Sequence, residues 1–215
     1  EIGNLPNGID TQYKIDKSPR GDIQLNIDHF NFPGNDKRGV YDINFTIKQG
    51  TTVGIVGRTG SGKSTLIRLL LREFDTKNAQ DITYGGYPLR DYKVELLREQ
   101  FGYVPQEHFL FSTTIRNNIA FSNENIEDEQ IYEVSRLSHI HDDIMNFTNG
   151  YQTVVGERGV SLSGGQKQRV SIARALLLNP EVLILDDSLS AVDAQTEEVI
   201  LGNLERLRKN KTNII

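Results

Sequence analysis

The amino-acid sequence predicts an α/β fold in which a mainly parallel sheet is joined to an antiparallel β-region and a helical region. From Ile23 onwards apolar and polar residues alternate, as they do in an antiparallel strand with one buried face. The run "VLILD", residues 182–186, is apolar up to its final acid, as in a parallel strand covered on both faces. Residues 124–149 are polar overall but carry apolar residues at helical spacing, which predicts a helical insert.

The first third of the chain is expected to form a β-region followed by a strand, a loop and a helix. Residues 23–32 and 40–47 alternate as strands, and "PGNDKRG", residues 33–39, is expected as the turn between them. "TTVGIVG", residues 51–57, is a short β-branched run. After a glycine-rich loop, "STLIRLLLREF", residues 64–74, carries leucines at helical spacing.

The second half of the chain is expected to return to an α/β pattern after the helical insert. "QKQRVSIARALLL", residues 166–178, predicts a helix that stops at the following "NP". A last helix is expected over residues 196–209. "TNII", residues 212–215, begins another β-branched run, so the domain is expected to continue beyond it.

Composition and charge exclude several classes of protein. The chain has no cysteine, so it holds no disulfide framework, and "EIGNLPNGID" at its start lacks the pattern of a secretory signal. No apolar run approaches the roughly 18 residues of a membrane helix, so the fragment itself is expected to be soluble. With 24 basic and 29 acidic residues the net charge is -5, which argues against a nucleic-acid partner.

The strongest chemical signal is "GRTGSGKST", which matches the pattern G-x-x-x-x-G-K-[ST] between a predicted strand and a predicted helix. Glycines let successive backbone N–H groups surround a phosphate, the helix N-terminus adds positive dipole, the lysine reaches the β- and γ-phosphates, and the serine can hold Mg²⁺. A glycine-rich turn that binds nothing is the structural alternative. The pattern predicts a P-loop NTPase with a RecA-like core that binds the phosphates of a nucleotide and Mg²⁺. The proposed ATP-binding residues here are Gly57, Arg58, Thr59, Gly60, Ser61, Gly62, Lys63, Ser64 and Thr65.

Two further segments supply groups that a nucleotide site uses. Asp186 ends the strand 182–186, where a P-loop protein needs a carboxylate for Mg²⁺; a strand-end cap is the alternative. For Asp187, chemistry and a solvated or capping role both remain open. "SLSGGQ", residues 161–166, is a second glycine-rich turn at a helix start, which either serves the structure or completes a site on another molecule.

Taken in order, these segments resemble the nucleotide-binding domain of an ATP-binding cassette (ABC) protein. "GRTGSGKST" is similar to the Walker A motif, and "YVPQ", residues 103–106, to the Q-loop. "LSGGQ", residues 162–166, matches the signature, and "VLILDD", residues 182–187, matches Walker B. "SAVD" fits the D-loop, and "VVGERG" resembles the X-loop of exporter-type cassettes.

The resemblance implies a head-to-tail dimer in which each ATP lies between Walker A of one cassette and the signature of the other. On this chain it adds Phe32, which would stack on adenine unless it is core like Phe30, and Val40 to the ATP-binding residues. The partner's ATP would meet the signature, and Mg²⁺ would lie among three residues. The implied positions are Ser163, Gly164, Gly165 and Gln166 for the signature, Ser64, Gln106 and Asp186 for the metal, Gln106 and Asp187 for catalysis, Asp193 for the D-loop and Glu157 for the X-loop.

One position departs from the family pattern. The family places a catalytic glutamate after the Walker B aspartate, and this chain has Asp187. The shorter side chain withdraws the carboxylate by about 1.5 Å, and a misplacement of about 1 Å can cost on the order of a hundredfold in rate. The chain is therefore expected to be an ATP hydrolase that is weak or inactive alone, the degenerate-site half of a heterodimeric, multidrug-like bacterial exporter whose partner cassette carries the glutamate.

The same resemblance implies where the chain sits in a larger protein. Residues 1–22 are expected to be a linker from an upstream transmembrane domain and residues 23–215 a nucleotide-binding domain that ends before the switch histidine. About 107–165 would be its helical subdomain. The aromatic residues of 107–121 would either meet the coupling helices of the membrane domains or pack in the core. The expected location is the cytoplasmic face of the plasma membrane.

Other readings use similar motifs. A regulatory cassette that binds ATP without turnover is favoured by Asp187, and a soluble, non-transport ABC ATPase shares the four main motifs. A free-standing importer cassette would lack the linker and "VGERG". "HIHDD", residues 139–143, could suggest a metal site, but the resemblance implies a helix surface there.

Overall fold

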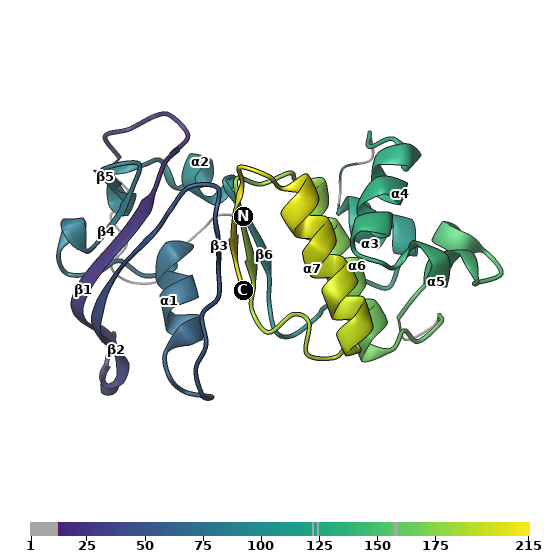
Figure 1. Cartoon of the computed structure of the whole chain (residues 1–215), viewed down its shortest axis with the longest axis horizontal. Coiled ribbons are helices and arrows are strands. Elements are labelled where there is room, and N and C mark those ends of the chain that lie inside the picture. The colour runs from purple at the N-terminus through teal and green to yellow at the C-terminus, as the bar shows by residue number, and fades with distance from the viewer. Residues whose placement is uncertain (1–12, 122, 124, 157–158) are drawn as a thin grey trace. The chain divides into compact units, whose positions relative to one another are not determined.

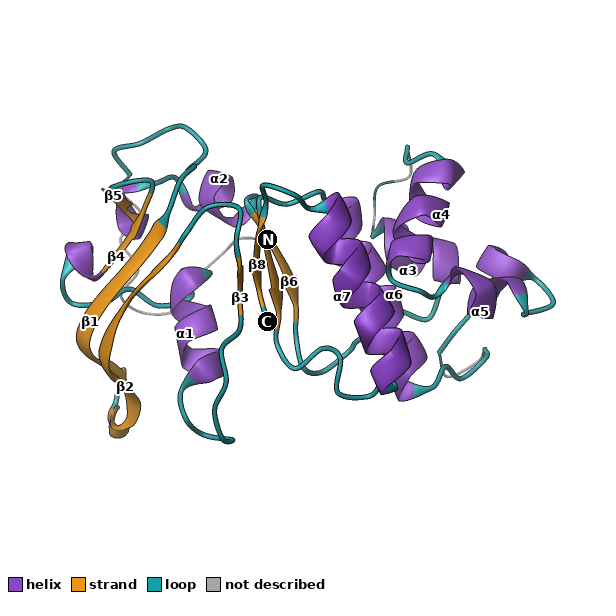
Figure 2. Ribbon diagram, in the orientation of Figure 1, coloured by secondary structure: helices purple, strands orange, loops and turns teal. Residues whose placement is uncertain are grey.

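The computed structural model describes residues 13–121, 123, 125–156 and 159–215 (Figure 1). The chain divides into two compact units. Unit 1 runs to Phe101 and includes Asn210–Ile215, and unit 2 is Gly102–Lys209. Each combines strands with helices, so the α/β class predicted from the sequence is confirmed (Figure 2).

Unit 1 contains the antiparallel β-region, a sheet in the order β2-β1-β4-β5. Its strands are β1 (Ile23–Phe32), β2 (Asn35–Ile47), β4 (Ile82–Tyr84) and β5 (Tyr87–Pro88). The predicted bounds of β1 are confirmed, and its buried residues pair with β2 in the register Ile23↔Ile47. The turn before β2 is shorter than expected, because β2 begins at Asn35.

Strand β3 (Thr52–Val53) of unit 1 pairs in parallel with β8 (Thr212–Ile214). The predicted strand is longer than β3, but the Ile55 N–H still donates to the Ile215 carbonyl at 2.7 Å. The two remote segments of this unit are thus joined by backbone hydrogen bonds.

Helix α1 (Lys63–Leu70) follows the glycine-rich loop and buries Leu66, Leu69 and Leu70. It ends four residues before the predicted end at Phe74. The Glu73 N–H donates to the Arg68 carbonyl and the Arg72 N–H to that of Leu69, which is the Schellman arrangement. Arg72 takes the left-handed position with φ 51° although it is not glycine. Its guanidinium is buried and bonded to Asp75 and to the Tyr92 carbonyl, which holds it there.

The rest of unit 1 includes the described end of the expected linker. Short helices η1 (Ala79–Asp81), η2 (Leu89–Asp91) and α2 (Val94–Arg98) follow α1. Ile15 forms a parallel bridge with Tyr92, and the N–H groups of Lys14 and Ile15 both donate to the Asp91 carbonyl at 2.8 Å. Residues 13–15 therefore lie on the surface of this unit.

In unit 2, strand β6 (Phe101–Val104) lies beside strand β7 (Val182–Leu185); the first residue of β6, Phe101, is assigned to unit 1. Every residue of β7 is buried. Its helices are α3 (Ile115–Ala120), α4 (Asp128–Leu137), α5 (His141–Met145), η3 (Gly150–Gln152), α6 (Gly164–Leu177) and α7 (Ala194–Leu207). The predicted insert is thus two helices, α4 and α5. Helix α6 packs against α3 and α4 (Figure 1).

Candidate nucleotide-binding site

The glycine-rich loop of unit 1 has a backbone that side chains would obstruct. Gly60 has φ 81° and Gly62 has φ 99°, in the left-handed region that glycine enters without a steric cost. A Cβ on Gly57 would lie 2.5 Å from Ser61 Oγ, and one on Gly62 would lie 2.7 Å from a methyl group of Val40. The loop therefore requires these glycines, and a methyl group of Val40, a predicted ATP-binding residue, lies close to Gly62.

Lys63 begins α1 and folds back over the loop. Its ammonium donates hydrogen bonds to the carbonyl oxygens of Gly57 and Arg58, the latter at 3.3 Å. No described carboxylate of unit 1 lies within ion-pair distance of it. A cation held by neutral carbonyls keeps its charge available for an anion.

The N-terminus of α1 completes the fit to a phosphate. Gly62 is the N-cap and offers no side chain, so no side-chain cap occupies this helix end. The first N–H groups of a helix have no intrahelical acceptor, and they carry the positive end of its dipole. Together with Lys63, the loop has the donors and the charge that a nucleotide phosphate needs.

Phe32 lies in an aromatic cluster of unit 1. Its half-buried ring meets those of Phe30 and Phe74 edge-on, with centroids 5.3 and 5.1 Å apart, and the Arg68 guanidinium lies 5.4 Å from its centroid. Phe30 is buried at 6% exposure and is therefore core. Phe32 retains exposed surface, which adenine stacking requires.

In unit 2, Asp186 follows the buried strand β7. Its N–H donates to the Val104 carbonyl at 3.0 Å, and the Tyr103 hydroxyl donates to its Oδ2 at 3.3 Å. Ser188, fully buried, donates from Oγ to the same Val104 carbonyl at 2.7 Å. The ends of β6 and β7 are therefore fastened together, and the Asp186 carboxylate is a hard oxygen ligand suited to Mg²⁺.

The next residue, Asp187, is exposed and has φ 51°. Its carboxylate accepts a hydrogen bond from the side-chain amide of Gln106 at 3.2 Å, and its carbonyl accepts one from Ser190 Oγ at 3.0 Å. The structure thus brings together the two predicted catalytic residues of this unit. Aspartate tolerates the left-handed region better than most residues, which suits it to this turn.

Ser163 caps helix α6, which begins two residues earlier than predicted. Its Oγ accepts from the Gln166 N–H at 3.2 Å, and the Gln166 side chain accepts from the Ser163 N–H at 3.0 Å. This reciprocal capping box leaves the N–H groups of Gly164 and Gly165 with no acceptor in the described part of the chain. The helix end keeps two donors and its dipole for an anion.

The same helix end packs against the predicted D-loop. A Cβ on Gly165 would lie 2.8 Å from the Ala191 carbonyl oxygen, so glycine permits this close approach. The Gln168 side chain donates to Ser190 Oγ at 3.3 Å and accepts from the Ala191 N–H at 2.9 Å. The signature turn and the D-loop are thus one packed assembly within unit 2.

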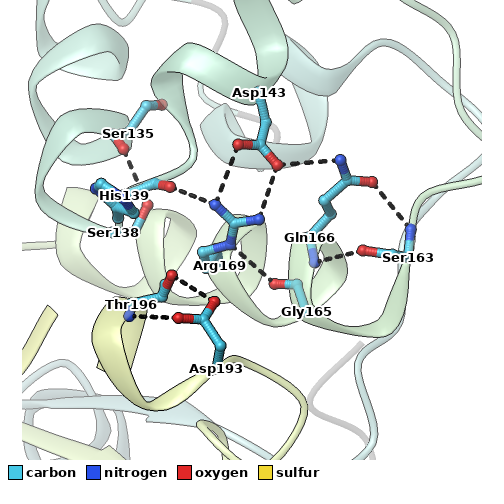
Figure 3. A network of polar contacts seen from close by, with 10 residues as sticks. All are labelled: Ser135, Ser138, His139, Asp143, Ser163, Gly165, Gln166, Arg169, Asp193 and Thr196. Atoms are coloured by element: carbon cyan, nitrogen blue, oxygen red, sulfur yellow. Dashed lines mark hydrogen bonds and ion pairs between the residues drawn. The ribbon is translucent and has the colours of Figure 1, made fainter. Parts of the chain in front are cut away.

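Figure 3 shows a polar network at α6 that sequence reasoning missed. Asp143 of α5, from the "HIHDD" stretch expected as helix surface, accepts from both Nη atoms of Arg169 at 3.3 and 2.8 Å and from the Gln166 side chain at 3.1 Å. Burial raises the pKa of Asp143, but the bonds from Arg169 and Gln166 outweigh burial and hold it below its ordinary value. Arg169 also donates to the carbonyls of His139 and Gly165.

Asp193, the predicted D-loop acid, is the N-cap of α7 (Figure 3). It accepts from the Thr196 N–H at 2.9 Å and from the Thr196 hydroxyl at 2.7 Å. These hydrogen bonds lower the pKa of Asp193. The last helix therefore begins at Ala194, two residues before its predicted start.

The aromatic residues after the Q-loop are exposed, not core: Phe109 by 66%, Phe111 by 44% and Phe121 by 50%. Buried Asn118 fixes the backbone of Phe111, because its amide donates to the Phe111 carbonyl at 3.0 Å and accepts from the Phe111 N–H at 2.8 Å. A cavity of about 460 Å³ adjoins Phe111 and Phe121. It is lined by Phe111, Thr113, Arg116, Asn117, Ala120, Phe121 and Asn123.

The predicted X-loop residue Glu157 and residues 1–12 of the predicted linker lie outside the described residues.

Comparison with known proteins places these sites in a family. The chain is 45% identical over 206 residues to the probable multidrug resistance ABC transporter ATP-binding/permease protein YheI of Bacillus subtilis, covering 96% of this chain and 35% of that protein. It is 49% identical over 196 residues to the multidrug resistance-like ATP-binding protein MdlA of Escherichia coli, covering 91% and 33%. The chain spans about a third of the length of these curated relatives.

A solved structure agrees with the curated relatives. The structure of a bacterial Atm1-family ABC exporter with ATP bound has a TM-score of 0.83 and 36% identity, over 91% of this chain and 34% of that one. Across the described residues, the helices are too short or too polar to span a bilayer. A family model described as "ABC transporter" matches residues 40–190, more than half of the chain. The chain belongs to the ABC transporter family.

Proposed function

We propose that the chain is the ATP-binding and ATP-hydrolysing motor of a multidrug-type ABC exporter, acting as half of a head-to-tail dimer. The observation that carries the proposal is the presence of two separate glycine-rich helix N-termini, at α1 and α6, each of which is suited to bind a phosphate. One nucleotide does not need both on one chain. A second cassette that lends its own signature, and receives this one, gives each helix end a nucleotide.

The chain's own ATP would bind the loop Gly57–Thr65. Lys63, which has no carboxylate within ion-pair distance among the described residues of its unit, would compensate the β- and γ-phosphate charge. Phe32 would stack on adenine and Val40 would lie beside the loop. Mg²⁺ would be held by oxygen atoms of Ser64, Gln106 and Asp186 and would polarise the γ-phosphate.

The partner's ATP would face Ser163, Gly164 and Gly165, with Gln166 completing the signature. Support comes from the N–H groups of Gly164 and Gly165, which find no acceptor among the residues that the structure describes. The capping box also supports it: Ser163 Oγ already accepts a hydrogen bond, so its own proton remains to be donated. Asp193 would couple the two sites across the dimer.

The chain's own site would hydrolyse ATP slowly. Asp187 is one methylene shorter than glutamate, and its bond to Gln106 holds the carboxylate near the strand end. The partner would then be a different cassette that carries glutamate. A second candidate, a regulatory cassette that binds ATP without turnover, is favoured by the same residue.

The exposed cluster of Phe109, Phe111 and Phe121 would receive the coupling helices of transmembrane domains, as would Glu157. A clustered apolar surface beside a 460 Å³ cavity suits the insertion of a short helix. Such docking would put the chain at the cytoplasmic face of the plasma membrane. The curated relatives are described as ATP-binding/permease or multidrug resistance proteins, which supports a membrane partner.

The decisive experiment compares two variants in the assembled transporter. Asp187→Asn in this chain is expected to change ATP turnover by less than about threefold, whereas removing the partner's glutamate is expected to lower it by on the order of a hundredfold. Equal losses would refute the degenerate site. ATP binding measured with Lys63→Met, against the exposed control Lys77→Met, tests the nucleotide site itself. Tight binding to the chain with no turnover in any assembly would favour the regulatory cassette.

A further inference from the structure

Asp143 stands outside every motif of the proposed site, yet both of its side-chain partners lie on the first two turns of α6 (Figure 3). Arg169 binds it with both Nη atoms and Gln166 with its amide. The side chain of Asp143 is 31% exposed and that of Arg169 only 12%. Such a bidentate, partly buried pair fixes both side chains more firmly than a surface ion pair does.

Gln166 passes this restraint to the phosphate-binding end of the helix. One end of its amide donates to Asp143, and the other end accepts from the Ser163 N–H. Arg169 in turn donates to the Gly165 carbonyl at 3.3 Å. Asp143 therefore reaches the two residues that flank Gly164.

Charge also matters at this helix end. Arg169 is paired with Asp143, so the positive charge of the guanidinium and the negative charge of the carboxylate balance each other beside the glycines. Phosphate recognition is left to backbone N–H groups and the Ser163 hydroxyl, whose positions are set by the backbone. Fixed dipoles of this kind discriminate by geometry, because they need no rearrangement to receive the anion.

We propose that Asp143 is a positioning residue that holds the signature end of α6 in the geometry that distinguishes ATP from ADP on a partner cassette. This inference rests on the proposed function. The N–H groups of Gly164 and Gly165 and the Ser163 hydroxyl would bind the terminal phosphate of ATP, which ADP lacks. A cradle that is displaced by about 1 Å loses on the order of a hundredfold in rate, so partial loosening is expected to cost about tenfold.

The test uses the assembled transporter with three substitutions in this chain. Asp143→Asn removes the charge but keeps the size, Asp143→Glu keeps the carboxylate, and Asp142→Asn removes the same charge from the adjacent exposed residue. The preference for ATP over ADP is measured by nucleotide competition, with the melting temperature and ATP turnover alongside. Amide hydrogen exchange of the peptide 161–169 reports the helix end directly.

Asp143→Asn is expected to lower both the preference for ATP over ADP and ATP turnover about tenfold, while ADP affinity stays unchanged. Hydrogen exchange of the backbone N–H of Gln166 is expected to become faster. Asp143→Glu should retain most of the preference, and Asp142→Asn all of it. A preference within about twofold of the unsubstituted protein in Asp143→Asn would overturn the inference. A fourth substitution, Gly164→Glu, distinguishes failure of this inference from failure of the proposed function, because it places a carboxylate where the phosphate would lie. If Gly164→Glu also leaves ATP turnover unchanged, the proposed function is refuted. If Gly164→Glu abolishes turnover while Asp143→Asn has no effect, only the role of Asp143 is refuted.

Discussion

The Gln106 amide donates a hydrogen bond to the Asp187 carboxylate at 3.2 Å, which joins the end of the Q-loop to the residue after Walker B within one unit. Gln106 therefore has its side chain directed at the position where the family carries glutamate. Both candidate catalytic groups are preorganised by the same strand ends, because Val104 accepts from Asp186 and from Ser188.

Asp187→Glu is expected to raise turnover at this chain's own site by at least about tenfold, because the added methylene moves the carboxylate outwards by about 1.5 Å. The measurement uses a transporter whose partner glutamate is replaced by glutamine, so that turnover above background comes from this site. Asp187→Asn in the same background is the matched control. A gain in neither variant would show that side-chain length does not limit this site.

Asp193 is predicted to have separable structural and coupling roles. Asp193→Ala removes the N-cap of α7 and should lower the free energy of unfolding by about 1 kcal/mol, whereas Asp193→Asn keeps an acceptor for the Thr196 N–H and should cost only a few tenths. Urea unfolding measures both variants. If Asp193→Asn nevertheless lowers turnover of the assembled transporter, the charge acts beyond the cap; equal destabilisation by both variants would contradict the capping account.

Arg72→Met should destabilise unit 1 strongly. The substitution removes the ion pair between Arg72 and Asp75, whose side chain is 13% exposed, and the hydrogen bond to the Tyr92 carbonyl, which together should cost about 3 kcal/mol. Arg68→Met on the same helix breaks the half-exposed pair with Glu73 and the guanidinium contacts with the Phe32 and Phe74 rings, and should cost about 1 kcal/mol. Similar unfolding free energies for the two variants would show that burial of Arg72 adds nothing.

The depressed pKa of Asp143 predicts an acid-sensitive contribution to stability. Because the folded pKa lies below the unfolded value of 3.8, the carboxylate stabilises the fold above that value and the contribution disappears as the pH falls through the folded pKa. Melting temperatures measured from about pH 6 to about pH 3 should fall less steeply for Asp143→Asn. Asp142→Asn should keep the original slope, and a slope unchanged by Asp143→Asn would contradict the prediction.

Local rules predicted the glycine-rich loop well, because Gly57, Gly60 and Gly62 are dictated by backbone geometry within a few residues. The predicted end of α1 was wrong. Nothing in the sequence indicates that Arg72 takes a left-handed conformation, because that conformation depends on the tertiary hydrogen bonds of its guanidinium. The Ser163–Gln166 capping box was readable, since S-x-x-Q at a helix start is its pattern.

Asp143 and Arg169 lie 26 residues apart, so no periodicity or motif links them before the helices pack. The same holds for Gln168, which meets Ala191 across 23 residues. The sequence therefore indicates candidate groups for phosphate binding, whereas the residues that hold those groups in position are found only from the fold. The division of the helical insert into α4 and α5 was also not predictable from the sequence. The chain turns between these helices at His139, which has φ 57°, and no glycine marks the turn.

The parallel bridge between Ile15 and Tyr92 makes this part of unit 1 a mechanical attachment point. Tension applied along the chain at residues 13–15 would shear the hydrogen bonds to Asp91 and from Lys93 together, since these bonds run across the direction of pull. The load would enter the antiparallel region at η2 before it reached β1. A pull from this side would thus be resisted by a segment nearly 80 residues further along the chain, and Lys14, bonded to Asp91, would bear it before Ile15 does.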